Sequence, residues 1–261
     1  MKINLKGKNA LVGGSSKGIG RAIAEQLAAS GANVTVMARS EMVLNEVVNQ
    51  LTTNSGQKHQ YLVVDFSNFT DFTVKIKEYF KNNLVDILIN NTQGPSAGGA
   101  LEKSIDDYQA AFDLLFKCAV LTTNLALSHM QEKKWGRIIN VASISVREPL
   151  NYLSLSNSLR AALVTWAKSV SLDIAVDNIT INNTLTGYFD TERIAQLNAQ
   201  KAKKMGIPVS EVRAALEDSV PAKRIGRPEE YANLVCFLAS EQASYITGTN
   251  IPIDGGLLKS F

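Results

Sequence analysis

Ser156 and Arg160 are four residues apart in the stretch LSLSNSLRAAL, where an amphipathic helical pattern begins. Because this spacing is about one helical turn, both side chains lie on the same face of the expected helix. A serine hydroxyl donates or accepts hydrogen bonds, and an arginine stays charged and keeps its fork of donors. The pair can therefore hold or polarise an oxygen atom, but it contains no acid or base that titrates near neutral pH.

A glycine-rich turn is the second candidate site. The run GGSSKGIGRAIAEQLAASG follows a β-branched segment and leads into an amphipathic helix. Glycines allow positive φ there and let backbone N–H groups approach a pyrophosphate at the positive helix end. Strand, turn and helix in this order predict a dinucleotide site, and a turn whose glycines serve only packing is the alternative. The expected cofactor-binding residues are Gly14, Ser16, Lys17, Gly18, Ile19 and Gly20.

Arg39 and Ser40 follow the second expected strand, in the stretch MARS. An enzyme that selects NAD usually has an acidic residue here, against the ribose 2′-hydroxyl. Arg39, together with Lys17 in the glycine turn, instead suits a 2′-phosphate. The sequence favours NADP over NAD; the alternative is that both cations are simply solvated.

Short β-branched segments alternate with longer amphipathic segments along the chain. Alternation of this kind requires parallel pairing with right-handed crossovers, and therefore predicts an α/β fold with a doubly wound parallel sheet, a Rossmann fold. No repeat or linker divides residues 1–261, so a single domain is expected, with ligands at the carboxyl ends of the strands. The expected strands are NALVG, NVTVMA, HQYLVVD, VDILIN, GRIINVAS, ITINNTL and TNIPID, and the expected helices cover about 18–31, 41–54, 70–82, 104–131, 155–176 and 228–239, with a polar helical insertion near 192–218.

Composition argues against several classes of partner. The net charge is +3 and the lysines and arginines are scattered, which does not suit nucleic acid. We expect no signal peptide and no segment long enough to span a membrane, and hence a cytoplasmic protein. Cys118 and Cys236 lie in apolar runs and are predicted to be core thiols, and His59 and His129 lack partners at ligand spacing, so no metal is expected.

Six blocks are distributed along essentially the whole chain: GGSSKGIG, VVD at 63–65, ILINN at 87–91, GRIINVAS at 136–143, KRIGRPEE at 223–230 and SYITGTNIPIDGG at 244–256. Together they resemble the short-chain dehydrogenase/reductase family, and most closely the members labelled 3-oxoacyl-acyl carrier protein reductases. The resemblance implies NADP-dependent interconversion of a carbonyl and an alcohol, on a small-molecule or acyl-carrier-bound substrate. It also implies a homotetramer or homodimer built through the helices around 104–131 and 155–176.

The resemblance also assigns cofactor contacts. Asp65 is expected at the adenine amino group, Asn90 beside the adenosine ribose, and Thr191 at the nicotinamide amide. Arg160 is expected to hold the ribose hydroxyls in place of the family lysine. The family motifs differ here at Gly13, at Thr92-Gln93 and at Thr186, but none of these differences removes a phosphate contact.

The catalytic positions of the family are mostly replaced. Ser143 matches the family serine, whereas Ser156 stands at the tyrosine position, Arg160 at the lysine position and Leu115 at the asparagine position. A serine hydroxyl is far less acidic than a phenol with a pKa of about 10, so the usual proton transfer is lost. The expected site polarises the substrate oxygen through Ser143 and Arg160, and water or a displaced tyrosine donates the proton.

Two tyrosines are candidate proton donors, and the sequence does not identify the substrate. Tyr188 lies in the loop TGYFDT and Tyr152 lies one turn before Ser156; the alternative is that both only line the pocket. The insertion at 192–218 is expected to form a lid, whose lysines either attract an acidic substrate or are solvated. A catalytically inactive NADP-binding regulatory or scaffold protein, or a non-redox lyase, dehydratase or isomerase, is the alternative function.

Overall fold

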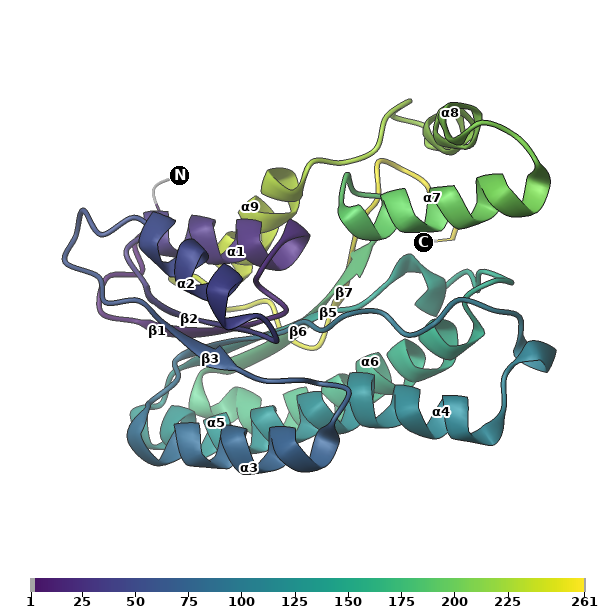
Figure 1. Ribbon diagram of the computed structural model, residues 1–261. Coiled ribbons are helices and arrows are strands. Elements are labelled where there is room, and N and C mark those ends of the chain that lie inside the picture. The colour runs from purple at the N-terminus through teal and green to yellow at the C-terminus, as the bar shows by residue number, and fades with distance from the viewer. Residues whose placement is uncertain (1–2, 261) are drawn as a thin grey trace.

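A seven-stranded sheet with helices on both faces forms the centre of the computed structural model, which describes residues 3–260 (Figure 1). Every registered strand pair is parallel, in the order β3-β2-β1-β4-β5-β6-β7, so the predicted Rossmann fold is confirmed. The strands are β1 Asn9–Gly13, β2 Asn33–Ala38, β3 Gln60–Val63, β4 Ile87–Asn90, β5 Gly136–Val141, β6 Ile179–Thr186 and β7 Asn250–Ile253. The helices are α1 Gly18–Ala29, α2 Glu41–Gln50, α3 Phe69–Asn82, α4 Ile105–Phe112, α5 Cys118–Lys133, α6 Ser154–Ile174, α7 Glu192–Met205, α8 Val209–Ser219 and α9 Pro228–Leu238.

Strand periodicity divides the apolar side chains between two cores. In β1, Val12 packs with the layer that contains α1 and α9, whereas the preceding residue, Leu11, packs with the layer that contains α3, α5 and α6. Successive side chains of a strand point to opposite faces, so each strand contributes to both layers. The near-continuous hydrophobic runs of the strands follow from this burial on both faces.

The long helix expected at 104–131 is not a regular helix. A π-helical segment, Asp113–Lys117, separates α4 from α5 and buries Leu114 and Leu115. The segment Ile105–Lys133 has 29 residues, and an 18-residue stretch within it has a mean hydropathy of 1.5, so the expectation that no segment reaches membrane-spanning length was wrong. Met130 and Ala126 of α5 are buried in the second core, against the sheet, as in a core helix.

The polar insertion forms two helices, α7 and α8, above the carboxyl edge of the sheet (Figure 1). Gly206 follows α7 in the left-handed region, at φ 68°, a conformation that glycine adopts at little cost. Pro208 then precedes the first residue of α8. The predicted bend at Gly206 and Pro208 is therefore confirmed.

Buried charges at the amino ends of the strands are paired. Asp86 is fully buried and its carboxylate lies 2.7 Å from Lys133 Nζ and 3.3 Å from His129 Nε2. Arg137 is also fully buried and lies 3.4 Å from a carboxylate oxygen of Glu241. Its remaining donors reach three backbone carbonyls, at 2.8 to 3.2 Å.

Cys118 and Cys236 are buried and free, as predicted. Burial raises the pKa of the Cys118 thiol to about 12, which keeps it protonated and unreactive at neutral pH. Within residues 3–260 no cluster of three or more histidine, cysteine or acidic side chains is arranged to hold a metal ion.

Candidate active site

A cleft of about 740 Å³ opens at the carboxyl ends of the strands. The glycine turn lines one side, and the ends of β4 and β5 with the first turns of α6 and α7 line the other. Sequence-predicted residues that line it are Gly14, Ser16, Lys17, Gly18, Ile19, Gly20, Arg39, Ser40, Ser143, Ser156, Arg160 and Thr191. The cleft therefore brings together most of the cofactor and catalytic candidates.

The glycine turn has a backbone that larger residues cannot follow. Gly14 has φ of 55°, in the left-handed region. A Cβ on Gly20 would lie 2.2 Å from the carbonyl oxygen of Gly14, so the first turn of α1 packs directly on the loop. Ser15 secures the turn, because its Oγ donates to Val12 O at 2.8 Å and accepts from Met37 N at 2.9 Å.

Two helix N-termini meet at this turn. No side-chain cap occupies the N-terminus of α1, which begins at Gly18, so its backbone N–H groups stay available for an anion. Thr191 caps α7, and its Cγ2 is 3.3 Å from the position that a Cβ on Gly18 would occupy. These features, together with the glycine cradle, fit the pyrophosphate of a dinucleotide.

Arg39 directly follows β2, Lys17 lies in the glycine turn, and both line the cleft. Arg39 is exposed and forms no ion pair with any residue from 3 to 260, and Ser40 caps α2 by accepting from Val43 N at 3.5 Å. Lys17 is paired with Glu192 at the start of α7. The two cations fit a 2′-phosphate, and Lys17 must exchange Glu192 for that phosphate.

Asp65 lies just outside the cleft residues, next to Phe66, which lines the cleft. Its Oδ1 accepts from the Ser67 hydroxyl at 2.6 Å and from Ser67 N at 2.9 Å. Partial burial acts to raise the pKa of Asp65, but these hydrogen bonds and the charges of Arg39 and Lys75 outweigh burial and lower it. The carboxylate is therefore ionised and ready to accept a hydrogen bond.

Asn90, expected beside the ribose, lines the small cavity that Asn91 and Arg160 also line. Its Nδ2 donates to Thr123 Oγ1 at 3.1 Å and to Asn140 Oδ1 at 2.8 Å, which engages both amide hydrogens. The pattern continues across the sheet, since Asn140 donates to Asn183 and Asn183 to Asn250, each at 2.8 Å. Asn90 thus begins a row of amides that joins four neighbouring strands.

Ser143, Ser156 and Arg160 form the polar group at the other end of the cleft. Arg160 Nε donates to Ser156 Oγ at 3.2 Å, and Nη1 donates to the carbonyl oxygen of Val141, the last residue of β5. Ser143 Oγ accepts from Ser145 N at 3.1 Å. Because the Ser156 oxygen accepts from Arg160, its own hydrogen remains free to donate.

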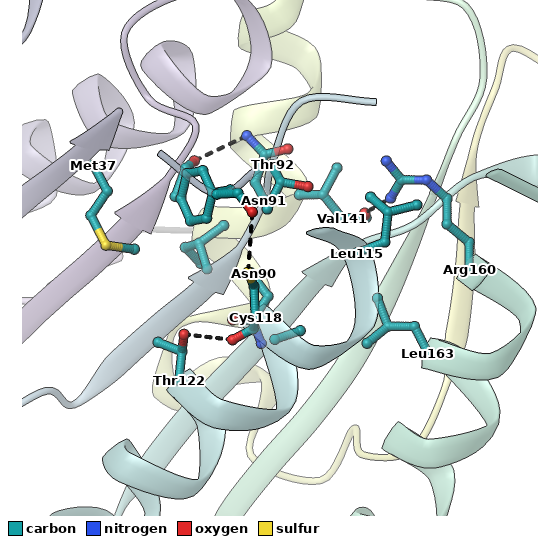
Figure 2. A pocket seen from close by; sticks show the side chains of 14 residues that line it. Met37, Asn90, Asn91, Thr92, Leu115, Cys118, Thr122, Val141, Arg160 and Leu163 are labelled. Atoms are coloured by element: carbon teal, nitrogen blue, oxygen red, sulfur yellow. Dashed lines mark hydrogen bonds between the residues drawn. The ribbon is translucent and has the colours of Figure 1, made fainter. Parts of the chain in front are cut away.

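Arg160 has no carboxylate partner among residues 3–260. Burial lowers the pKa of its guanidinium, and the charge of Arg193 acts in the same direction. A small cavity of about 20 Å³ lies behind it, with room for about one water molecule. Figure 2 shows Arg160 and Leu163 on one side of this cavity and Asn91 and Thr92 on the other, with Leu115 beside Arg160.

The two candidate tyrosines do not line the cleft. Tyr188 is half-buried and Tyr152 is 41% exposed. Burial, together with the neighbouring Tyr188 phenol, raises the pKa of Tyr152. Neither ring therefore lines the cleft that Ser156 and Arg160 line.

Sequence reasoning did not name three polar cleft residues whose side chains contact other cleft segments: Asn91, Glu192 and Arg193. Asn91 donates from Nδ2 to Gly13 O at 3.0 Å and fastens the end of β4 to the glycine turn. Glu192 and Arg193 also line the cleft, one on each side of it. Asn91 and Glu192 directly follow a predicted site residue, Asn90 or Thr191, and Arg193 is the next residue after Glu192; this proximity in sequence is the signal that could have found them.

Fold and site together define a dinucleotide-binding protein of the Rossmann type. A family model described as Enoyl-(Acyl carrier protein) reductase matches residues 14–258. The chain belongs to the short-chain dehydrogenase/reductase family.

Its relatives are reductases by name. The chain is 32% identical to the 3-oxoacyl-acyl-carrier-protein reductase FabG of Aquifex aeolicus, over 98% of this chain and 100% of the relative. It is 31% identical to the NADPH-dependent reductase BacG of Bacillus subtilis, over 97% and 98%. The solved structure of L-sorbose reductase from Gluconobacter frateurii, complexed with NADPH and L-sorbose, superposes with a TM-score of 0.92 at 31% identity and covers 100% of both chains.

Proposed function

We propose that this protein is an NADP(H)-dependent oxidoreductase that interconverts a carbonyl compound and the corresponding alcohol. One observation carries the proposal: Ser143, Ser156 and Arg160 line the same cleft as the glycine turn. A bound dinucleotide and the donors for a substrate oxygen therefore share one site. The reductase names of the relatives agree with this reaction class.

The cofactor is NADP(H) rather than NAD(H). Arg39 and Lys17 supply positive charge to the cleft, and within residues 3–260 no acidic residue lines it beside Arg39 and Ser40 to favour a ribose 2′-hydroxyl. Asp65 and Thr191 are the contacts proposed for the adenine and nicotinamide groups. When bound, NADPH supplies the hydride that the carbonyl carbon receives.

The protein's part in the reaction is stabilisation of negative charge on the substrate oxygen. Arg160 Nη2 has no hydrogen-bond partner within residues 3–260, and the Ser156 hydroxyl hydrogen is free, so both can donate to that oxygen. Donors fixed in a partly buried site stabilise a developing oxyanion far better than donors in water. Ser143 orients the same oxygen.

Proton donation needs a separate source. Arg160 cannot release its proton near neutral pH, and a serine hydroxyl is a weak acid. We propose that water entering the cleft protonates the alkoxide, leaving hydroxide, with the Tyr188 phenol as the alternative donor.

Domain organisation, assembly and location are part of the same proposal. Residues 1–261 form one domain, and α7 with α8, within 192–218, act as a lid over the substrate. The assembly is a homotetramer or homodimer, the protein works in the cytoplasm, and a 3-oxoacyl group bound to a carrier is one candidate substrate.

A second function, NADP binding without turnover, is favoured by one observation. No tyrosine among residues 3–260 lines the cleft, so the usual proton donor of the family has no substitute at the substrate oxygen. A regulatory or scaffold protein would keep the cofactor half of the cleft and need no donor.

Two successive measurements on one sample separate these functions. NADPH and NADH are titrated by intrinsic fluorescence, and a panel of ketones and 3-oxoacyl thioesters is then added while the nicotinamide absorbance is followed. We expect tighter binding of NADPH and its oxidation by at least one carbonyl, with turnover reduced in Ser143→Ala, Ser156→Ala and Arg160→Met. Tight binding with no oxidation on the whole panel would contradict the enzyme and support the binding protein.

A further inference from the structure

Arg193 is a second cation in the cleft, in the first turn of α7. The side chain is half-buried, and its Nη2 donates to the carbonyl oxygen of Pro95 at 2.9 Å. Its guanidinium atoms lie 3.6 to 3.8 Å from the position that a Cβ on Gly94 would occupy. Arg193 therefore crosses from α7 to the loop after β4.

The acidic residues next to Arg193 are engaged elsewhere. Glu192 pairs with Lys17 of the glycine turn. Asp190 pairs with Arg213 of α8, through bonds of 3.1 and 3.2 Å. Arg193 itself forms no ion pair with any residue from 3 to 260, so the protein leaves its charge unbalanced.

The position of this charge is unfavourable in the absence of a ligand. A cation in the first turn of a helix faces the positive end of the helix dipole. Partial burial removes water from the guanidinium and lowers its pKa. Arg160, also without a carboxylate among residues 3–260, lines the same cleft, and the charge of Arg193 acts to lower the pKa of Arg160. A bound anion between Arg193 and Arg160 would relieve all three costs.

The anion has two chemical sources, a phosphate of the cofactor or an acidic group of the substrate. The glycine turn, where the pyrophosphate fits, is contacted by Glu192, whereas Arg193 points to Gly94 and Pro95 on the opposite wall. The geometry therefore favours the substrate as the source.

We propose that Arg193 is a specificity residue that binds a carboxylate on the substrate, so that the enzyme prefers oxo acids to neutral ketones. This inference rests on the proposed reductase function. In it, Arg193 holds the carboxylate while Arg160 and Ser156 face the carbonyl oxygen.

Matched acids and esters test the proposal. With saturating NADPH, kcat and KM are measured for levulinate and methyl levulinate, and for 4-oxocyclohexanecarboxylate and its methyl ester. The variants are Arg193→Met, Arg193→Lys and, as a control, Lys77→Met, which removes an exposed charge on α3 outside the cleft.

The wild type is expected to favour the acids. A hydrogen-bonded charge pair of this kind is worth about 10- to 100-fold in affinity. Arg193→Met should lower the acid-to-ester ratio of kcat/KM by about that factor, mainly through KM, with Arg193→Lys intermediate and Lys77→Met like the wild type. NADPH affinity should fall much less.

Three results would overturn the proposal. An unchanged acid-to-ester ratio with weakened NADPH binding would assign Arg193 to the cofactor phosphates. An equal loss for acid and ester would make Arg193 only an anchor for α7 on Pro95. Preference for neutral acetoacetyl-pantetheine, unaltered by Arg193→Met, would exclude an acid requirement.

A binding measurement separates failure of the proposed anion site from failure of the proposed reductase function. If no probe is reduced, binding of levulinate and methyl levulinate to the NADPH-loaded protein is compared by saturation-transfer NMR. Selective binding of the acid that Arg193→Met removes would support the anion site without the reaction, and equal binding of acid and ester would reject it.

Discussion

The two ends of the sheet treat charge in opposite ways. At the amino ends of the strands, Asp86 and Arg137 are fully buried, and each has an oppositely charged partner and further hydrogen bonds. At the carboxyl ends, Arg160 and Arg193 are partly buried and have no carboxylate partner within residues 3–260. The first arrangement balances the cost of removing charge from water, and the second does not.

This difference separates residues that hold the fold from residues that await a ligand. A buried pair loses stability when one partner is removed, because the other is left without compensation. An unbalanced cation in a cleft lowers the stability of the fold, and a protein retains such a cation when its charge binds a ligand. The comparison therefore predicts opposite effects of substitution at the two ends.

Arg160→Met should give the largest effect on function. Loss of one oxyanion donor lowers kcat/KM by about 100- to 1000-fold, which corresponds to about 2.7–4 kcal/mol. The melting temperature should stay equal or rise, because a desolvated charge is replaced by an apolar side chain. Steady-state kinetics and thermal unfolding on the same preparations measure kcat/KM and the melting temperature. A variant with normal kinetics and a lower melting temperature would show that Arg160 holds the fold and does not serve the reaction.

Asp86→Ala should have the opposite profile. His129 and the Asn9 N–H lose their buried acceptor, which should lower the free energy of unfolding by about 3 kcal/mol. Chemical denaturation measures this change. NADPH affinity at a temperature where the variant is folded should remain within about twofold, since such distant sites rarely couple, and a selective loss of NADPH binding would show that the two ends are not independent.

Arg39→Ala tests the adenosine end of the cleft, where the cation is exposed. Loss of one charged donor to the 2′-phosphate should weaken NADPH binding by about tenfold and NADH binding far less. Fluorescence titration of both cofactors gives the ratio. An equal loss for both would mean that Arg39 does not contact a 2′-phosphate.

A change of pH should have the smallest effect on kcat/KM. Burial raises the pKa of Tyr152, so its phenol stays protonated throughout the neutral range, and Ser156 and Arg160 do not titrate there. We expect log kcat/KM to be nearly flat from about pH 6 to about pH 9. A clear limb within that range, lost in Tyr188→Phe, would identify Tyr188 as the proton donor.

Much of this architecture could be predicted from the sequence, because periodicity and glycine spacing are local. The seven strands, the bend at Gly206 and the glycine turn follow from residues close together in the chain. The π-helical segment at 113–117 was missed because an apolar pattern does not reveal one changed turn.

The omissions at the site have a different cause, which is contact between distant segments. Strand register places Asn90 against Asn140, and its amide donates to Asn140 across the sheet, a contact that no local pattern reveals. Arg193 is identified as an unpaired cation of the cleft only from two tertiary contacts: its own bond to Pro95 and the pairing of Glu192 with Lys17. Such facts depend on tertiary structure, which one sequence does not contain.

The most direct test of the central claim is transfer of deuterium from NADPH labelled at the transferable nicotinamide position. The wild-type protein and Arg160→Met, both saturated with this cofactor, are incubated with 4-oxocyclohexanecarboxylate and the products are analysed by NMR. We expect an alcohol with deuterium on the former carbonyl carbon for the wild type, and a strongly reduced yield for the variant. Bound cofactor with no labelled alcohol, from this acid or from the wider carbonyl panel, would contradict the claim.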